Sequence, residues 1–522
     1  MALTENSLAP ALGIAGKNVP QKIGAEVLQR KILLIGTYDP SIDTVVDEVP
    51  KRVFSPEDVG AQTGFGFMLH RMAVRAFKGA PSVEIYIQPQ AEAGGSDQSE
   101  GSILFTAAAG KAGTIYFYVN DQVVSINVAA DDTVDDHATD LIAAINGDKT
   151  LPVTALVDGV ESAQVNITAK SAGEYWGDSI SLAVGINGEE ELGDVAYTIT
   201  AMNSGAGTPD ITDALEALGT GSAQNSDFYT DVVHGYGPVT AVLDKVQSYN
   251  GIADTEVGNF DDLVHKPFRS LNGDTTAGTG GLSTLISFGD GRQETDRTSG
   301  IIPVPGSKSH PVEIACIAMG YMASQNNKQA ELSYRGIILE GIHPGDVSDR
   351  WTNDYSTGRD AAAQAGISST LVKSGSVTMQ NALTFYHPAA IPATSNAYRN
   401  MRNISIIQNI FNSVNAVFSL PTWQNFSIVT DLAFVSNVNS RKTAKSVSSV
   451  KDAWIALFEA FAGRAWIADL QFSIDALKES SSVIIRTGGN GFDSNPKFIF
   501  SGDGDIIDNN IEYDTSFAVL QQ

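Results

Sequence analysis

Four short segments of the chain carry residue types that can bind phosphate or a metal ion. Residues 60–66 and 306–309 contain glycines, and the second segment adds a lysine and two serines. Neither has the glycine spacing that brings backbone N–H groups onto a dinucleotide or a phosphate. Residues 343–349 have one histidine and two aspartates but no second histidine or cysteine pair, and residues 503–509 lack the glutamate that ends a calcium loop. The spacing therefore predicts no cofactor and no metal site.

Nucleophilic catalysis is not indicated either. The seven histidines stand singly, at positions 70, 137, 234, 265, 310, 343 and 387. No serine lies in a Gly-x-Ser-x-Gly turn, although a Ser-His-Asp triad forms in space and spacing alone leaves it open. The single cysteine, Cys316, lies in the apolar run 314–319 and is expected to be a buried apolar side chain. We expect no enzyme and no catalytic residue.

The charge balance narrows the choice of partners. The chain of 522 residues has 60 acidic and 33 basic residues, a formal net charge of −27. Such a chain repels phosphate backbones and anionic membranes, so we expect no nucleic acid partner and no direct membrane insertion. No stretch approaches the ~18 apolar residues of a membrane helix, and the amino terminus lacks the pattern of a signal peptide. Folding in a cytoplasm is expected.

Strands and helices alternate through much of the chain. Strands at 31–37 and 83–87, with a helix at 66–77 between them, predict a βαβ unit, and Ser55 before Pro56 predicts a helix start. The alternation resumes with a helix at 210–218, a strand at 229–234, a helix at 239–249, a strand at 282–288, a helix at 312–325 and a strand at 336–339. Residues 272–281 are expected to form a mobile loop. The pattern favours a three-layer α/β scaffold.

A β-rich module interrupts this scaffold between residues 102 and 202. Strands are predicted at 103–106, 114–119 and 123–128, with a tight turn at Asn120-Asp121, and further strands at 153–156, 165–169 and 179–184. An acidic helix is expected at 133–145. The fold class is therefore α/β (α+β) and multidomain: an α/β scaffold with an inserted β-sandwich-like module and extended terminal strand arms.

The two ends of the chain differ from the middle. Residues 1–25 contain prolines, glycines and small residues typical of an extended arm, and residues 511–519 alternate with the period of a strand. A terminal strand can complete its own sheet, fray, or join a sheet of another subunit. Between them, helices are predicted at 398–418 and 450–461 (capped by Ser448 or Ser449), and strands at 377–379, 383–386, 482–486 and 497–500. The predicted domains are 1–25 (arm), 26–101 with 203–344 (middle domain), 102–202 (outer module), 345–508 (carboxyl-terminal core) and 509–522 (arm).

Several of these segments together resemble one family. Residues 112–120 and 151–155 of the module, residues 289–296 followed by 302–307, and the run 332–345 are similar to the tail sheath proteins of contractile-tailed phages of the Mu-like group. The resemblance extends over nearly the whole chain, and the order of the segments agrees with that family.

The resemblance implies a structural protein of the virion. Such subunits form hexameric rings stacked as a helical polymer around a tail tube, exchange terminal strands, and contract to drive the tube through the host envelope. The partners implied are other copies of the chain, the tube protein, and the baseplate and tail terminator proteins, with assembly in the host cytoplasm and no cofactor. The implied inter-subunit strand residues are Leu8, Leu12, Ile14, Val19, Ile511, Tyr513, Phe517 and Val519, and the residues of a possible tube-facing helix are Lys451, Asp452, Glu459 and Arg464. An acidic surface-layer or adhesin-like protein is the alternative.

Overall fold

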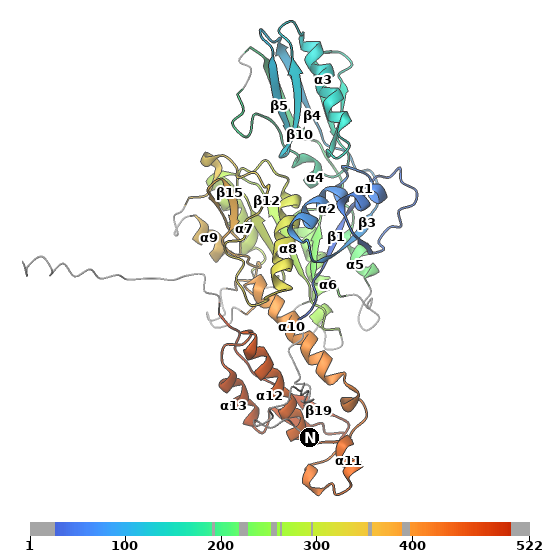
Figure 1. Ribbon diagram of the computed structural model, residues 1–522, viewed down its shortest axis with the longest axis vertical. Helices are drawn as coiled ribbons and strands as arrows, with labels where there is room; N and C mark the ends of the chain where they lie inside the picture. Colours follow the sequence, from blue (N-terminus) through green and yellow to red (C-terminus); the bar gives the residue numbers. More distant parts are fainter. Residues whose placement is uncertain are drawn as a thin grey trace, which may run out of the picture. The chain divides into compact units, whose positions relative to one another are not determined.

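A computed structural model describes residues 27–190, 194–218, 228–251, 258–260, 264–293, 296–352, 358–388 and 397–502 (Figure 1). The described chain divides into a larger unit, from Val27 to Phe411, and a smaller unit, from Asn412 to Ser501. Both terminal arms predicted from the sequence, with all eight inter-subunit strand residues, lie outside the described residues. The division falls inside a helix at Phe411, and the domain limits predicted from the sequence stay predictions.

A six-stranded sheet in the order β13-β12-β11-β1-β3-β2 forms the centre of the larger unit. Five neighbouring strands run parallel: β1 (Lys31–Thr37), β3 (Glu84–Gln90), β11 (Asp231–His234), β12 (Arg269–Asp274) and β13 (Ser299–Pro303). The short strand β2 (Lys51–Val53) pairs antiparallel with β3 at one edge. Strand β1 is an apolar run whose residues 32–35 are fully buried, as a parallel strand covered on both faces requires.

Helices cover both faces of the sheet because the crossover connections on the two sides of β1 run in opposite directions. The crossover from β1 to β3 passes through α1 (Pro56–Thr63) and α2 (Met68–Gly79), whereas α5 (Ile211–Ala217), α6 (Thr240–Asn250) and α7 (Gly278–Asp290) belong to the crossovers towards β13. Right-handed crossovers in opposite directions put their helices on opposite faces. Helix α8 (Pro311–Asn326) packs on α2, where a Cβ added to Gly79 would lie 2.4 Å from the Ile317 carbonyl oxygen. Glycine thus permits the close approach of these helices.

Three expectations for the scaffold are wrong. Residues 282–288, predicted as a strand, lie in α7, because Leu282, Leu285 and Gly289 form one buried helical face. The expected mobile loop at 272–281 instead contains the end of β12 and the start of α7. Residues 336–339 make a single bridge, between Ile338 and Thr378, rather than a strand of the central sheet.

The inserted module is a sandwich of two sheets, which confirms its predicted β-sandwich-like character. One sheet has the order β10-β4-β8-β7 and the other β6-β5-β9. Its elements are β4 (Glu100–Ala107), β5 (Gly113–Val119), β6 (Gln122–Val128), α3 (Val134–Gly147), β7 (Val153–Val157), β8 (Gln164–Ala169), α4 (Glu174–Asp178), β9 (Leu182–Val184) and β10 (Ala196–Asn203). Asn120 takes a φ of 56° in the β5–β6 turn, and a capping box between Thr133 and Asp136 starts α3. Helix α4 and strand β10 were not predicted.

The rest of the larger unit packs beside the sheet. It contains α9 (Arg359–Gln364), the hairpin of β14 (Thr370–Lys373) and β15 (Ser376–Met379), and the first part of α10 (Met401–Phe418). Arg30, just before β1, is buried and its guanidinium donates to Gln408 and Ser405 of α10. The predicted helix at 398–418 therefore exists and is held by polar bonds at its start.

The smaller unit has a helical part and fragments of sheet. Its helices are α11 (Val438–Thr443), α12 (Val447–Gly463) and α13 (Leu470–Lys478), and its strands are β16 (Ser427–Ile428), β17 (Ala444–Lys445), β18 (Val483–Ile485) and β19 (Phe492–Ser494). Apolar residues of α12 make the core, among them Trp454, Leu457, Phe458 and Phe461. The helix predicted at 450–461 is confirmed, but its cap is Ser446 rather than Ser448 or Ser449.

Candidate functional site

A ligand in an α/β sheet usually binds at the carboxyl ends of the parallel strands. It lies between two neighbouring strands whose connections run to opposite sides of the sheet. In this chain that place lies between β1 and β11. The Met68 sulfur lies 3.4 Å from the Thr37 backbone nitrogen, and a Cβ added to Gly235 would come within 2.1 Å of the same sulfur. A side chain of the scaffold therefore fills the crevice.

Helix α4 of the inserted module occupies the neighbouring part of this sheet edge. Trp176 is 1% exposed, and its ring lies 4.2 Å from the ring of His310 at the start of α8. The Tyr175 hydroxyl donates to the Gly273 carbonyl oxygen at 2.8 Å, and a Cβ added to Gly237 would meet the Tyr175 ring at 2.3 Å. The edge that could hold a substrate thus holds the module.

His310 is neutral in this arrangement. Its Nδ1 accepts from the Val312 backbone N–H at 3.3 Å, and its Nε2 lies 2.9 Å from the Trp176 carbonyl oxygen, to which it must donate. Burial lowers the pKa of His310 to about 4, and burial also lowers the pKa values of His70 and His234 to about 4. None of the three is poised near pH 7 as a general base.

A buried ionic cluster connects α2, α8 and the module. Glu313 of α8 accepts from Arg71 Nε at 2.8 Å and from Arg75 Nε at 2.6 Å. Arg75 also pairs at 2.5 Å with Asp121 in the β5–β6 turn, and Ser309 donates to the same carboxylate at 2.6 Å. Burial alone would raise the pKa of Glu313, but the two guanidinium groups outweigh it and lower the pKa to about 2. The cluster is charged at neutral pH and positions the module on the scaffold.

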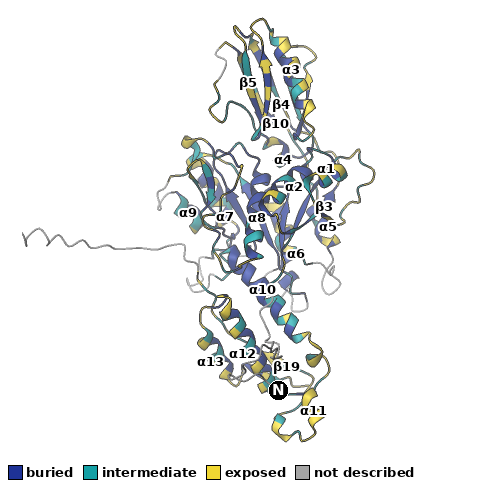
Figure 2. Ribbon diagram, viewed as in Figure 1, coloured by how far each residue is buried: buried dark blue, intermediate teal, exposed yellow. Residues whose placement is uncertain are grey.

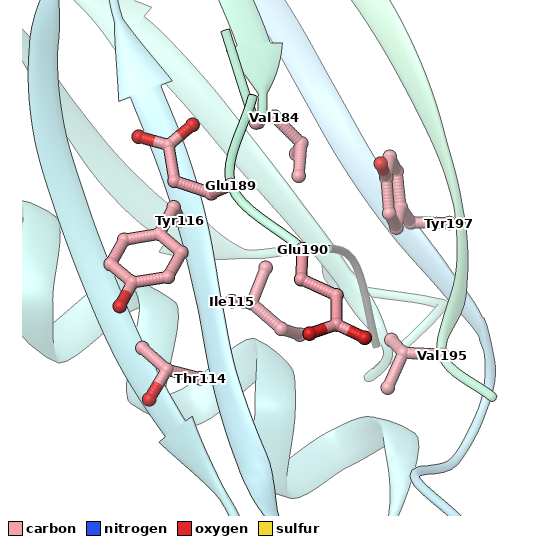
Figure 3. Close-up of a pocket in the computed structure, with 9 residues that line it drawn as sticks. Thr114, Ile115, Tyr116, Val184, Glu189, Glu190, Val195 and Tyr197 are labelled. Atoms are coloured by element: carbon pink, nitrogen blue, oxygen red, sulfur yellow. The ribbon is translucent and has the colours of Figure 1, made fainter. Parts of the chain in front are cut away.

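The space between the two sheets of the module offers little room for a ligand. Figure 3 shows a pocket between its sheets, lined by apolar Ile115, Val184 and Val195 with the Glu189 and Glu190 carboxylates beside them. Its free volume of about 10 Å³ is close to that of a single water. Among the described residues, no group of three or more His, Cys, Asp or Glu side chains could hold a metal ion. Within the same residues, no helix is long and apolar enough to cross a membrane.

The smaller unit presents open sheet edges. Its described strands form only pairs, β16 with β17 and β18 with β19, plus a bridge between Ile467 and Phe500. Two-stranded sheets are marginally stable and leave backbone N–H and C=O groups unpaired. Six large apolar side chains are exposed in this unit: Leu420, Phe434, Val438, Phe472, Ile484 and Ile499. Unpaired backbone groups beside exposed apolar side chains are suited to pairing with a further strand, from another part of the chain or from another copy.

The candidate tube-facing residues lie on the outer side of α12 and just after it. Asp452 and Glu459, seven residues apart, share one exposed face, and Arg464 is exposed beyond the end of the helix, near the Trp466 ring. Lys451 is half-buried and donates to the Glu479 carbonyl oxygen at 3.1 Å. The structure therefore brings the two acids together and turns the lysine towards α13.

Two groups of residues escaped the sequence reasoning. The ionic cluster joins residues up to 242 positions apart, a distance at which no spacing rule operates. The second group is the basic set Arg441, Lys442 and Lys445 around α11. In a chain this acidic, three cations within five residues are a pattern from which a basic surface could have been predicted.

Comparison with known proteins agrees with the sequence resemblance. No family model matches the chain. The chain is similar to the tail sheath protein of the Mu-like prophage FluMu of Haemophilus influenzae, at 24% identity over 422 residues, 78% of this chain and 79% of that protein. Among solved structures it aligns with the sheath tail protein from Desulfitobacterium hafniense (12% identity, 94% and 97% of the two chains, TM-score 0.45). It also aligns with the contracted PVC sheath complex of an extracellular contractile injection system (10% identity, 98% and 100% covered, TM-score 0.43). The sequence match confirms the predicted resemblance to Mu-like tail sheath proteins.

Proposed function

We propose that this chain, a contractile tail sheath protein of the Mu-like group, polymerises as stacked hexameric rings around a tail tube and contracts to drive the tube through the host cell envelope. The similarity to a Mu-like tail sheath protein over 422 residues supports the structural role. The filling of the sheet edge by Met68, Tyr175 and Trp176 agrees with a scaffold used for assembly rather than for binding a substrate.

The open sheet fragments of the smaller unit are the observation that carries the proposal. Strands β18 and β19 pair only with each other among the described residues, and Ile484 of β18 is 47% exposed. Residues 511–519 of the sequence have the alternation of a strand. A strand from another copy would satisfy unpaired backbone groups and cover the exposed side chains. We place residues 511–519, and residues 4–20 of the other arm, in this role.

The remaining partners follow from a sheath. The exposed face of α12 with Asp452 and Glu459, and Arg464 after it, is the proposed contact with the tube, whereas the first and last rings would meet the baseplate and the tail terminator. Assembly would take place in the host cytoplasm and the product would be part of the virion. Contraction needs two arrangements of the interface between subunits, with free energy stored at assembly. Strands shared between copies would keep the rings connected during the change.

Polymerisation by strand exchange is tested with two matched pairs of substitutions. Phe517→Ser with Val519→Ser removes apolar side chains from one face of the terminal strand, and Ser516→Gln with Ala518→Gln changes the opposite face by the same number of residues. We expect the first variant to lose polymers in electron micrographs and to sediment as a monomer, whereas the control still polymerises. Tubes formed equally by both variants would contradict strand exchange. Flat lattices from the unaltered chain would instead favour a surface-layer protein.

A further inference from the structure

We propose that the basic face of α11 in one copy binds the acidic segment 503–510 of another copy. The basic face is defined as Val438, Arg441 and Lys442 of α11 with the adjoining Lys445. This inference rests on the proposed polymerisation and names the surface that receives the carboxyl-terminal segment.

Helix α11 lacks a partner for its side chains within the described chain. None of its six residues is buried, and Val438 is 69% exposed (Figure 2). Its start is fixed by Asn437, whose side chain accepts from the backbone N–H groups of residues 439 and 440 at 2.9 and 3.1 Å. Helices this short are not stable alone in water. An ordered, capped and wholly exposed helix is what a docking surface requires.

One side of α11 combines an apolar residue with two cations. Val438, Arg441 and Lys442 are three and four residues apart and therefore share a face. Lys445 follows in β17, where its ammonium lies 4.5 Å from the centre of the Trp423 ring. No ion pair joins any of these three cations to a carboxylate of the described residues. The position of Arg441 and Lys442 near the end of α11 suits the helix dipole, and that interaction leaves their charged groups open to a ligand.

The charges of the chain point to the carboxyl-terminal segment as this ligand. Residues 412–501 contain eight basic and seven acidic residues, whereas the whole chain has 33 and 60. Residues 503–522 contain five acidic residues, Asp503, Asp505, Asp508, Glu512 and Asp514, and no basic residue. An excess of acids elsewhere in the chain disfavours docking of this segment on the larger unit. The basic face of α11 attracts it.

The length and order of the segment fit such a contact between copies. Twenty extended residues can reach about 70 Å, enough to leave one subunit and cross to another. Asp503, Asp505 and Asp508 precede the alternating residues 511–519. Charge attraction would therefore hold the segment first and set the register in which the following strand pairs, because electrostatic complementarity mainly governs encounter and orientation.

Charge reversal in the full chain tests the contact. The face variant is Arg441→Glu with Lys442→Glu and Lys445→Glu, and the segment variant is Asp503→Lys with Asp505→Lys and Asp508→Lys. Exposed ion pairs are individually weak, so we expect three lost pairs to raise the lowest concentration that supports polymers about 10- to 100-fold in each variant. A control for the face variant, Lys111→Glu with Lys245→Glu and Lys373→Glu, makes the same change of net charge as that variant at exposed lysines of the larger unit. It should polymerise as the unaltered chain does.

An equimolar mixture of the two variants separates the possibilities. In the mixture, the normal face of one variant can take the normal segment of the other, and the reversed face can take the reversed segment. We expect polymers to return at the concentration of the unaltered chain, which folding of the segment onto its own subunit would not produce. A face variant that polymerises normally, a control as impaired as the face variant, or a mixture without rescue would each overturn the inference. If the unaltered chain forms no polymer at all, the proposed function itself fails.

Discussion

Replacing the buried carboxylate of Glu313 by an amide should destabilise the larger unit strongly. Glu313 is fully buried, and both of its carboxylate oxygens accept from guanidinium groups, at 2.8 Å from Arg71 and 2.6 Å from Arg75. Glu313→Gln keeps the shape and one acceptor but leaves Arg71 buried without a counter-charge. Breaking a buried pair in this way costs about 3–5 kcal/mol.

Hydrogen exchange of the α8 amides measures this loss directly, because a chain of several units need not unfold in one transition. A loss of about 3 kcal/mol corresponds to exchange from the open state that is roughly 150-fold faster. The control is Glu479→Gln, which removes a half-exposed partner of Lys497 at 3.3 Å and should cost less than about 1 kcal/mol. Equal effects of the two substitutions, or less than about 1 kcal/mol for Glu313→Gln, would refute the role given to the cluster.

Three further predictions concern the larger unit, including the module and its attachment. The free energy of unfolding should fall as the pH drops from about 6.5 towards 4, because the histidines of the unfolded chain bind protons in this range whereas buried His310 and His234 do not. Each histidine accounts for about 3 kcal/mol at most. Urea unfolding at pH 7, 5 and 4 measures this dependence, and a flat profile would contradict it. Trp176→Ala should lower the free energy of unfolding by about 3–5 kcal/mol and make the module more sensitive to protease. The control Tyr116→Ala, at a 36% exposed position, should lower it far less. Similar protease sensitivity in both variants would contradict the docking of α4. Thr133→Ala should cost about 1 kcal/mol through loss of the α3 cap, visible as faster exchange in the first turn of α3 only; unchanged exchange there would count against the capping box.

The sequence predicted those elements in which local preference and burial agree. Strand β1 is a continuous apolar run ending at glycine, and the β5–β6 hairpin has Asn120 where a positive φ is needed. Helix α7 misled because its β-branched and aromatic residues favour a strand, while its glycines pack closely, as at Gly289, where an added Cβ would meet the Ala365 carbonyl oxygen at 2.2 Å. Such a preference for helix is set by tertiary contacts and not by the segment itself.

Other features were out of reach because they depend on distant parts of the chain. Helix α4 has five residues, too few for a periodic pattern, and its place at the sheet edge follows from contacts of Trp176 with a residue 134 positions away. The buried cluster around Glu313 likewise joins three separate segments. The basic residues of α11 were readable as charges, but only the structure shows that they belong to a helix that buries none of its side chains.

Electron cryomicroscopy of polymers formed by the purified chain tests the central claim most directly. We predict tubes in which residues 511–519 of one copy form a strand against β18 or β19 of another copy. Terminal residues folded onto their own subunit in every copy, or a chain that remains monomeric at all concentrations, would contradict the account.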